Sequence, residues 1–231
     1  MRTAPPKPER IGICVSFPKS GRTWLRVMLD ELRIPLRYTH AGSNHEFAHP
    51  LEQLSNPSDW LGDKPVVFLH RDPRDVVVSG FFQVTKRIGS YEEDLSAFLR
   101  DPRYGLRKVV AFNDLWLAAA RDRQDVCVVG YEALHASAHD ELHRIARFFG
   151  QTRDAELVAK AAEAGRFETM QEKETSGAYR DQYGALLSPA NPTDRESLKV
   201  RRGAIGGFVD YFSVEDIAYC DDVMARRSIS R

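Results

Sequence analysis

The segment 16–24 holds the residues whose types and spacing are best suited to chemistry. Lys19, Ser20 and Gly21 are consecutive in it, and a second hydroxyl side chain, Thr23, follows two residues later. A cation, hydroxyl donors and a glycine that lets the backbone approach a ligand are the groups that bind phosphate or sulfate. The segment therefore predicts an anion-binding loop.

The flanking residues predict a strand before this loop and a helix after it. Residues 11–15 are short, apolar and largely β-branched, whereas apolar side chains recur at helical spacing over residues 24–32. Ser20 is available as the helix N-cap. The N-terminus of such a helix directs free backbone N–H groups into the loop, which favours an anion there.

A nucleoside-triphosphate P-loop is one alternative, and an ordinary turn between strand and helix is another. The P-loop pattern is G-x-x-x-x-G-K-[ST], but Lys19 here precedes Gly21, and Ser16 stands where the first glycine would be. Pro18 also fixes the backbone just before the lysine. The shorter loop suits a smaller, diester-like anion, and the ordinary turn stays open.

Composition predicts one globular domain over residues 1–231. Hydrophobic residues make up 42% of the chain, and 33 Lys and Arg balance 33 Asp and Glu. The protein therefore has no global field to attract nucleic acid or an anionic membrane, and any anion site must be local. We expect residues 1–10, which are polar and proline-rich, to form a loose tail, and we expect no signal peptide and no membrane span.

Three cysteines cannot all pair within one chain, and two of them lie in strand-like runs. Cys14 and Cys127 are surrounded by apolar residues, which favours a role in core packing. This usage indicates a reduced, cytoplasmic protein.

Residues 65–82 repeat the order of strand, turn and helix. The apolar run 65–70 ends at Arg71, after which Asp72 is a candidate N-cap and Pro73 fits the first helical position. Asp75 adds a carboxylate to the first turn, where the helix dipole favours it.

A third strand is expected over residues 126–132, between helical stretches at 109–121 and 141–149, with Gly150 placed to end the second of these. Strands that alternate with helices predict an α/β fold of three layers, in which a mainly parallel central sheet is flanked by helices. Ligands of such sheets bind beyond the carboxyl ends of the strands, where Lys19, Arg71 and Tyr131 fall.

Two later segments differ from the rest of the chain. Residues 171–199 are polar and interrupted by glycine and proline, so we expect a mobile loop or lid there. In 201–203, two arginines precede a glycine, which lets the backbone approach an anion closely. A helix over residues 214–226 is expected near the end.

Three blocks in this order, residues 19–24, 71–79 and 201–203, together resemble the PAPS-dependent sulfotransferases of the cytosolic type, which have a P-loop-like fold. PAPS is 3′-phosphoadenosine 5′-phosphosulfate, and the resemblance extends from about residue 11 to about residue 212. It implies an enzyme that moves the sulfuryl group of PAPS to a hydroxyl or amine of a small-molecule, sugar or lipid-like acceptor. A homodimer is a possible assembly.

The resemblance also implies where the donor binds. The loop of Lys19, Ser20, Gly21, Arg22 and Thr23 would hold the 5′-phosphosulfate. The 3′-phosphate would lie among Arg71, Ser79, Arg201, Arg202 and Gly203. The adenine would lie among Trp24, Tyr131, Phe167 and Met170.

The chain departs from the family pattern at three positions. Arg22 replaces the commoner threonine, Arg202 stands where lysine is usual, and Phe208 stands where tryptophan usually follows. None of these changes removes a group that the chemistry requires. Arg22 either contacts the phosphosulfate or projects into solvent, and both interpretations stay open.

Sulfuryl transfer resembles phosphoryl transfer, in which positioning and charge stabilisation supply most of the catalysis. Lys19 is then the main electrostatic group, and no metal is required. Histidine suits the role of base for the acceptor proton, and we select His40, whose context Tyr-Thr-His resembles the family's catalytic segment. His45 and His49 are the alternatives, and the spacing to Arg71 favours His49.

Two other function classes remain. An ATP-dependent kinase or other phosphotransferase would need Mg²⁺ and a carboxylate at a strand end, and a non-catalytic nucleotide-binding protein would bind PAPS without transferring its sulfuryl group.

Overall fold

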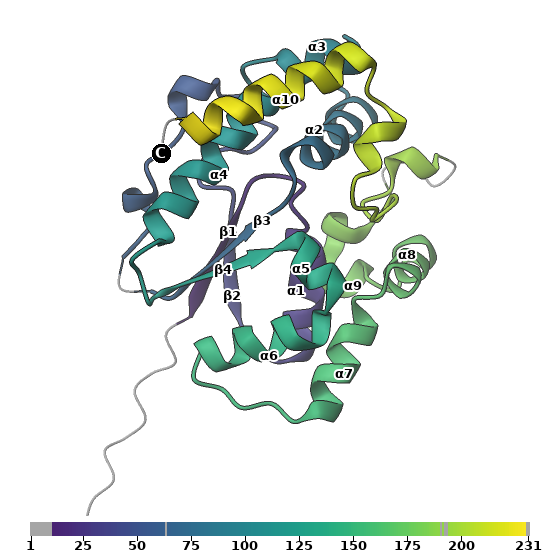
Figure 1. Ribbon diagram of the computed structural model, residues 1–231. Helices are drawn as coiled ribbons and strands as arrows, with labels where there is room; N and C mark the ends of the chain where they lie inside the picture. Colours follow the sequence, from purple (N-terminus) through teal and green to yellow (C-terminus); the bar gives the residue numbers. More distant parts are fainter. Residues whose placement is uncertain (1–10, 63, 190, 192–193, 230–231) are drawn as a thin grey trace, which may run out of the picture.

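In the computed structural model, four parallel strands form the centre of the protein (Figure 1). The structure describes residues 11–62, 64–189, 191 and 194–229, so the expected tail at residues 1–10 lies outside the described residues. The strands are β1 (Gly12–Ser16), β2 (Leu36–Thr39), β3 (Val66–His70) and β4 (Val126–Gly130), in the order β2-β1-β3-β4. The parallel sheet expected from the sequence is confirmed.

Alternate side chains of the strands are buried on opposite faces of the sheet, because successive residues of a strand point to opposite sides. Val15 and Phe68 are paired in register and join one cluster of buried side chains, while Cys14 and Val67 join another. The first cluster is covered by α2 (Pro73–Phe82), α3 (Leu95–Arg100), α4 (Leu106–Ala120) and α10 (Val214–Ile229). The second is covered by α1 (Arg22–Glu31), α5 (Tyr131–Ala136), α6 (Ala138–Phe148) and α7 (Ala155–Ala164). The three-layer prediction is therefore confirmed (Figure 1).

The start of α2 follows the sequence signals closely. The carboxylate of Asp72 accepts a hydrogen bond of 2.9 Å from the backbone N–H of Arg74, and Pro73 occupies the first helical position. At the end of α6, Gly150 has φ +65°, the left-handed conformation that closes many helices. Both predictions are confirmed, and they fix where the chain leaves β3 and where it turns back after α6.

The start of α1 differs from the prediction, since Ser20 is not its N-cap. Gly21 holds that position with φ +97°, and no side chain caps the helix. Lys19 is also left-handed, with φ +71°, so the loop turns more tightly than a Ser-capped helix would. Ser20 is fully buried instead, and its Oγ has no hydrogen-bond partner in the described structure.

Segment 171–199 contains more regular structure than the sequence suggested. It includes the end of α8 (Phe167–Ser176), the short α9 (Arg180–Tyr183) and the 3-10 turn Gly184–Leu187. Glu174 is fully buried and accepts hydrogen bonds of 2.8 Å from the backbone N–H groups of Lys199 and Val200. These bonds hold the C-terminal end of the segment in place, and its mobility stays a prediction. That residues 1–231 form a single domain also stays a prediction.

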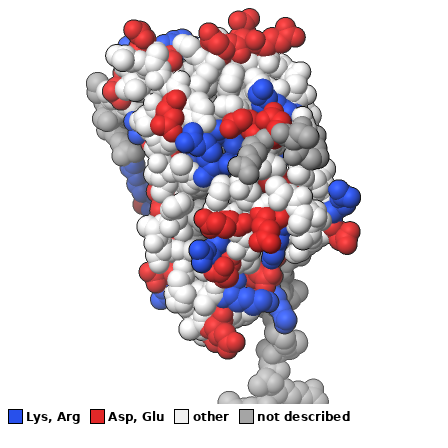
Figure 2. Space-filling view, turned by 90° about the vertical axis from the view of Figure 1, so that its right-hand side faces the viewer, with Lys and Arg blue, Asp and Glu red and all other residues white. Residues whose placement is uncertain are grey.

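The three cysteines are free and buried, as expected for Cys14 and Cys127. Among the described residues, no helix combines the length and apolar character that crossing a bilayer requires. Positive and negative side chains are interspersed over the face shown in Figure 2, with no large area of one sign. This face therefore offers no extended positive surface for an anion.

Candidate active site

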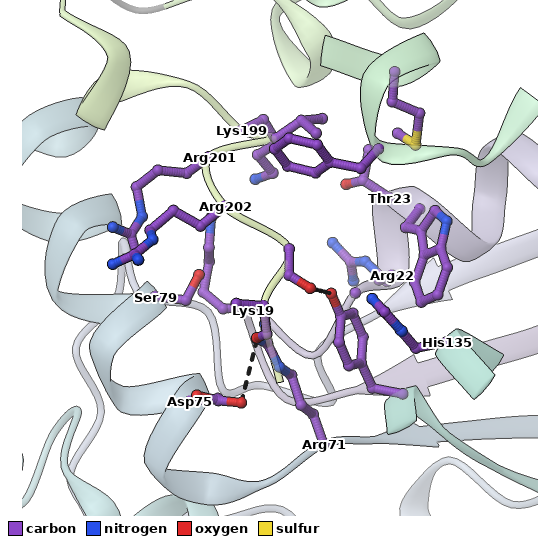
Figure 3. Close-up of a pocket in the computed structure, with 18 of the residues that line it drawn as sticks. Lys19, Arg22, Thr23, Arg71, Asp75, Ser79, His135, Lys199, Arg201 and Arg202 are labelled. Atoms are coloured by element: carbon purple, nitrogen blue, oxygen red, sulfur yellow. Dashed lines mark hydrogen bonds and ion pairs between the residues drawn. The ribbon is translucent and has the colours of Figure 1, made fainter. Parts of the chain in front are cut away.

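A pocket of about 580 Å³ lies where the strands β1 to β4 end and the following loops begin. Two candidates from the sequence do not line it, namely Ser20, which is buried within the loop before α1, and the alternative base His49. The predicted residues that line it are Lys19, Gly21, Arg22, Thr23, Trp24, His40, Arg71, Ser79, Tyr131, Phe167, Met170, Arg201, Arg202 and Gly203. Segments far apart in the sequence are therefore brought together at this end of the sheet (Figure 3).

The loop between β1 and α1 requires glycine at position 21. A Cβ atom there would lie 2.6 Å from Cδ2 of Tyr131, and the backbone is left-handed. Nζ of Lys19 donates a hydrogen bond of 3.0 Å to Oε1 of Gln83. Burial, reinforced by the charges of nearby lysines and arginines, holds the pKa of Lys19 well below its usual range. An anion bound here would relieve that repulsion.

Arg71 and Asp75 bind the loop that follows Arg201 and Arg202. Nη2 of Arg71 donates to the carbonyl oxygen of Ala204 at 2.8 Å and lies 3.5 Å from the Asp75 carboxylate. That carboxylate also accepts from the backbone N–H groups of Gly206 at 2.8 Å and Phe208 at 3.1 Å. Nε of Arg71 is buried and has no hydrogen-bond partner in the described structure. Arg71 thus keeps one donor for a ligand.

Gly203 is held against the adjacent aromatic side chains. Its carbonyl oxygen accepts a hydrogen bond of 3.0 Å from the hydroxyl of Tyr131, and its backbone has φ +64°. A Cβ at this position would lie 2.8 Å from the ring of Phe167. The guanidinium of Arg71 stacks 4.1 Å from the centre of the Tyr131 ring. Glycine is therefore required here both for the backbone angle and for space.

Arg201 and Arg202 lie on the same side of the pocket as Ser79 (Figure 3). The Arg201 guanidinium donates to Glu196 at 2.8 Å and to the hydroxyl of Tyr211 at 2.7 Å. The Arg202 guanidinium donates to the same hydroxyl at 2.9 Å and to Asp210 at 2.9 Å. The Arg201 side chain is mostly buried, with its guanidinium 4.1 Å from the centre of the Phe82 ring, whereas Arg202 is exposed.

Aromatic side chains line the opposite side of the pocket. Nε1 of Trp24 donates a hydrogen bond of 2.6 Å to the carbonyl oxygen of Gly165, which fixes the orientation of the indole. The Trp24 and Tyr131 rings meet edge to face with their centres 5.0 Å apart. Phe167 and Met170, from α8, complete this wall. It presents a flat apolar surface of the kind on which a heterocyclic ring stacks.

The three candidate histidines lie in different environments. His40 lines the pocket, and its Nδ1 lies 2.8 Å from the carbonyl oxygen of Ser16, so Nδ1 carries the proton and Nε2 is left as a basic nitrogen. Burial, with the charge of Arg22 as the next cause, lowers its pKa to about 3. His45 also lines the pocket and is buried. His49 is exposed, contacts Gln53 and is not among the lining residues.

Gln83 and Lys199 are among several lining residues that were not identified from the sequence, which also include Glu46, His135, Arg166 and Tyr211. Gln83 follows Ser79 by four residues, so helical spacing would have placed both on one face. Lys199 precedes Arg201 by two residues, and the basic composition of that stretch was the available signal. No group of three or more His, Cys, Asp or Glu in the described chain is arranged to hold a metal ion, and metal-free catalysis stays a prediction.

A family model of the sulfotransferase domain matches residues 48–229. Rat sulfotransferase 1C2 is 21% identical over 98% of this chain and 86% of its own length. Human sulfotransferase 2A1 is 25% identical over 87% of this chain and 78% of its own length. The chain is thus similar to curated sulfotransferases over nearly all of its length.

Solved structures show the same fold. Mouse sulfotransferase SULT7A1 complexed with PAP matches with a TM-score of 0.72 and 21% identity, over 95% of this chain and 85% of that one. Retinol dehydratase in complex with androsterone and the inactive cofactor PAP matches with a TM-score of 0.72 and 16% identity, over 96% and 81%.

Proposed function

The chain belongs to the sulfotransferase domain family and is an enzyme of that class, and from this premise we propose that it transfers the sulfuryl group of PAPS to a hydroxyl or amine of a small-molecule, sugar or lipid-like acceptor. One observation carries the proposal: partly buried cations and unpaired polar atoms converge at the carboxyl ends of the strands. Burying like charges together is unfavourable unless an anion joins them. PAPS has anionic groups at both the 5′ and the 3′ position of its ribose, which fits the two groups of cations in this pocket.

The 5′-phosphosulfate is assigned to the loop before α1. Nζ of Lys19 and the free N–H groups at the N-terminus of α1 are the donors available there, and the unpaired Oγ of Ser20, which does not line the pocket, is buried in the same loop. Aligned N–H groups at a helix start attract an anion through the helix dipole. The unpaired Ser20 hydroxyl supports this assignment, because a buried hydroxyl without a partner is costly.

The 3′-phosphate is assigned to Arg71, Ser79, Arg201 and Arg202. Nε of Arg71 is buried without a partner, and Arg201 and Arg202 can exchange their contacts with Glu196 and Asp210 for contacts with a phosphate. The adenine then lies against Trp24 and Phe167. With this assignment, one PAPS molecule contacts both the aromatic side and the cationic side of the pocket.

His40 is assigned as the base. Nε2 accepts the proton of the acceptor hydroxyl while the acceptor oxygen forms a bond to sulfur, and the bond from sulfur to the phosphate oxygen breaks. Lys19 stabilises the negative charge that develops on that oxygen. Because Nδ1 of His40 is bound to the Ser16 carbonyl, the ring is held in the tautomer that this step requires.

Calorimetric titration with adenosine 3′,5′-bisphosphate (PAP) and with ATP, each with and without Mg²⁺, tests the proposal. We expect tight binding of PAP that is independent of Mg²⁺ and weak binding of ATP. Preference for ATP with Mg²⁺ would support the phosphotransferase alternative. Binding of PAPS without transfer of its labelled sulfuryl group to any acceptor would support a non-catalytic protein.

The three buried free cysteines support a reducing compartment, the cytoplasm.

A further inference from the structure

Arg22 and Lys199 are two cations of the pocket whose side chains have no hydrogen-bond or ion-pair partner among the described residues. Both face the cavity in Figure 3. The contact of Lys199 with Glu174 is made by its backbone N–H, so its ammonium group is not used there. Burial lowers the pKa of Arg22 to about 10 and that of Lys199 to about 8. Two such groups are unfavourable together unless an anion lies between them.

Arg22, Lys199 and His40 line the same pocket. The charge of Arg22 is the largest electrostatic influence on His40, and that of Lys199 also acts on it, so both cations lie within electrostatic reach of the proposed base. Arg22 lines the pocket and is only partly exposed, so it does not simply project into solvent, which the sequence left undecided.

Other side chains are assigned to the two anionic groups of the donor. The proposed function assigns Lys19 to the phosphosulfate, and Arg71, Arg201 and Arg202 to the 3′-phosphate. Of the carboxylates that line the pocket, Asp75 is engaged by Arg71 and by backbone N–H groups. Glu168 also lines the pocket but is exposed and lies 3.9 Å from Arg166. Glu174 acts on Lys199, but it accepts two backbone N–H groups and lies 4.0 Å from Arg87. Glu46 is thus shared between Arg22 and Lys199, two partly buried cations, which leaves a positive surplus beside the proposed base.

We propose that the acceptor carries an anionic group, a carboxylate or a phosphate, close to the hydroxyl or amine that is sulfated, and that Arg22 and Lys199 bind this group. The inference rests on the proposed function. The anionic group fixes the orientation of the acceptor so that its hydroxyl meets Nε2 of His40. Guanidinium and ammonium donors both form strong charge-assisted hydrogen bonds to such oxygens.

Sets of matched acceptors test this assignment. Each set contains one hydroxyl compound as its carboxylate, as its phosphate ester and as its neutral methyl ester. Binding to the enzyme loaded with PAP is measured by calorimetry, and transfer from labelled PAPS gives kcat/KM. We expect the anionic members to bind and react at least about tenfold better than the methyl ester, and the ranking of carboxylate and phosphate identifies the anion.

Two variants locate the effect. Lys199→Gln and Arg22→Gln should each lower the ratio of kcat/KM for the anionic over the neutral acceptor about tenfold. Arg166→Gln is the matched control, because Arg166 also lines the pocket but is exposed and paired with Glu163. It removes the same charge and should leave the ratio unchanged.

The outcomes separate the two proposals. Normal PAP binding with equal use of neutral and anionic acceptors overturns the anionic-acceptor inference alone. A tenfold loss of PAP affinity in both Gln variants, with an unchanged acceptor ratio, assigns the two cations to the donor and also overturns it. Failure of the wild-type enzyme to bind PAP overturns the proposed function and this inference with it.

Discussion

Lys19 and Gln83 are joined by a hydrogen bond of 3.0 Å although 64 residues separate them in the sequence. Gln83 begins the π-helix Gln83–Ile88, which continues α2. In the same π-helix, Arg87 donates hydrogen bonds to the carbonyl oxygens of Ser188 and Ser197. The π-helix therefore connects the loop of Lys19 to segment 171–199, which precedes Arg201 and Arg202 in the chain. Such π-helical turns are frequent at functional sites.

A carboxylate at position 83 should compete with the donor for Lys19. In Gln83→Glu, the new charge forms an ion pair with the buried ammonium, which favours its protonated form and occupies it. We expect PAP affinity to fall tenfold or more, as measured by calorimetry. Gln83→Ala removes the contact without adding charge and should cost less affinity. The opposite ranking of the two variants would contradict the role given to this contact.

Replacing His40 should affect turnover more than donor binding. In His40→Gln we expect kcat to fall by about 10² to 10⁴, the usual contribution of a general base, while PAP affinity changes less than about threefold. Steady-state kinetics and calorimetry measure the two quantities separately.

The other two histidines serve as comparisons for that variant. His49→Gln should keep its turnover, because His49 is exposed and lies outside the pocket lining. His45 is packed edge to face against Phe17 and Tyr104. A loss of kcat in His49→Gln but not in His40→Gln would show that the spacing in the sequence was the better guide.

The fold could be predicted because its signals are local. Apolar runs end at charged or glycine-rich turns, and Asp72 and Pro73 place the start of α2 within one residue. The predicted start of α1 was wrong. Ser20 is a residue type that caps helices, but the left-handed backbone of Lys19 and Gly21 moves the N-cap to the glycine. That choice depends on the Tyr131 ring packed against the loop, a contact made in three dimensions only.

The site was predicted more completely at the donor end than at the acceptor end. Residues that bind a fixed set of phosphates occur in short motifs, such as 19–24 and 201–203, and the structure brings them to one pocket. Gln83 and Lys199 carry no such motif. Their positions depend on the π-helix after α2 and on the bonds from Glu174 to the chain at Lys199, neither of which the sequence pattern indicates.

Asp75 should stabilise both the fold and the donor site. Its carboxylate is buried, accepts two backbone N–H groups and neutralises Arg71. In Asp75→Ala these donors lose their acceptor, so the free energy of unfolding should fall by about 3 kcal/mol, as measured by urea denaturation. Asp75→Asn keeps one acceptor oxygen and should lose less. A change below about 1 kcal/mol in the alanine variant would contradict this role.

Stability should decrease on acidification because two buried histidines are held neutral. Burial lowers the pKa of His40 to about 3 and that of His45 well below its usual range, and the surrounding cations add to both shifts. In the unfolded chain a histidine has a pKa of about 6.5, so between pH 7 and pH 5 the unfolded state gains protons that the folded state does not. This difference favours unfolding as the pH falls.

For His40, the expected loss is about 2 kcal/mol between pH 7 and pH 5. The groups that act on His40 are Arg22, Lys199 and Lys19, and none of these cations loses its charge when the pH falls, so the shift persists. Other groups also titrate in this range, and the comparison with His40→Gln removes their contribution. The variant should lose about 2 kcal/mol less than the wild type in urea denaturation at the two pH values. Equal losses in both proteins would mean that His40 becomes protonated in the folded state above pH 5, and that its ring is more accessible to water than its contacts indicate.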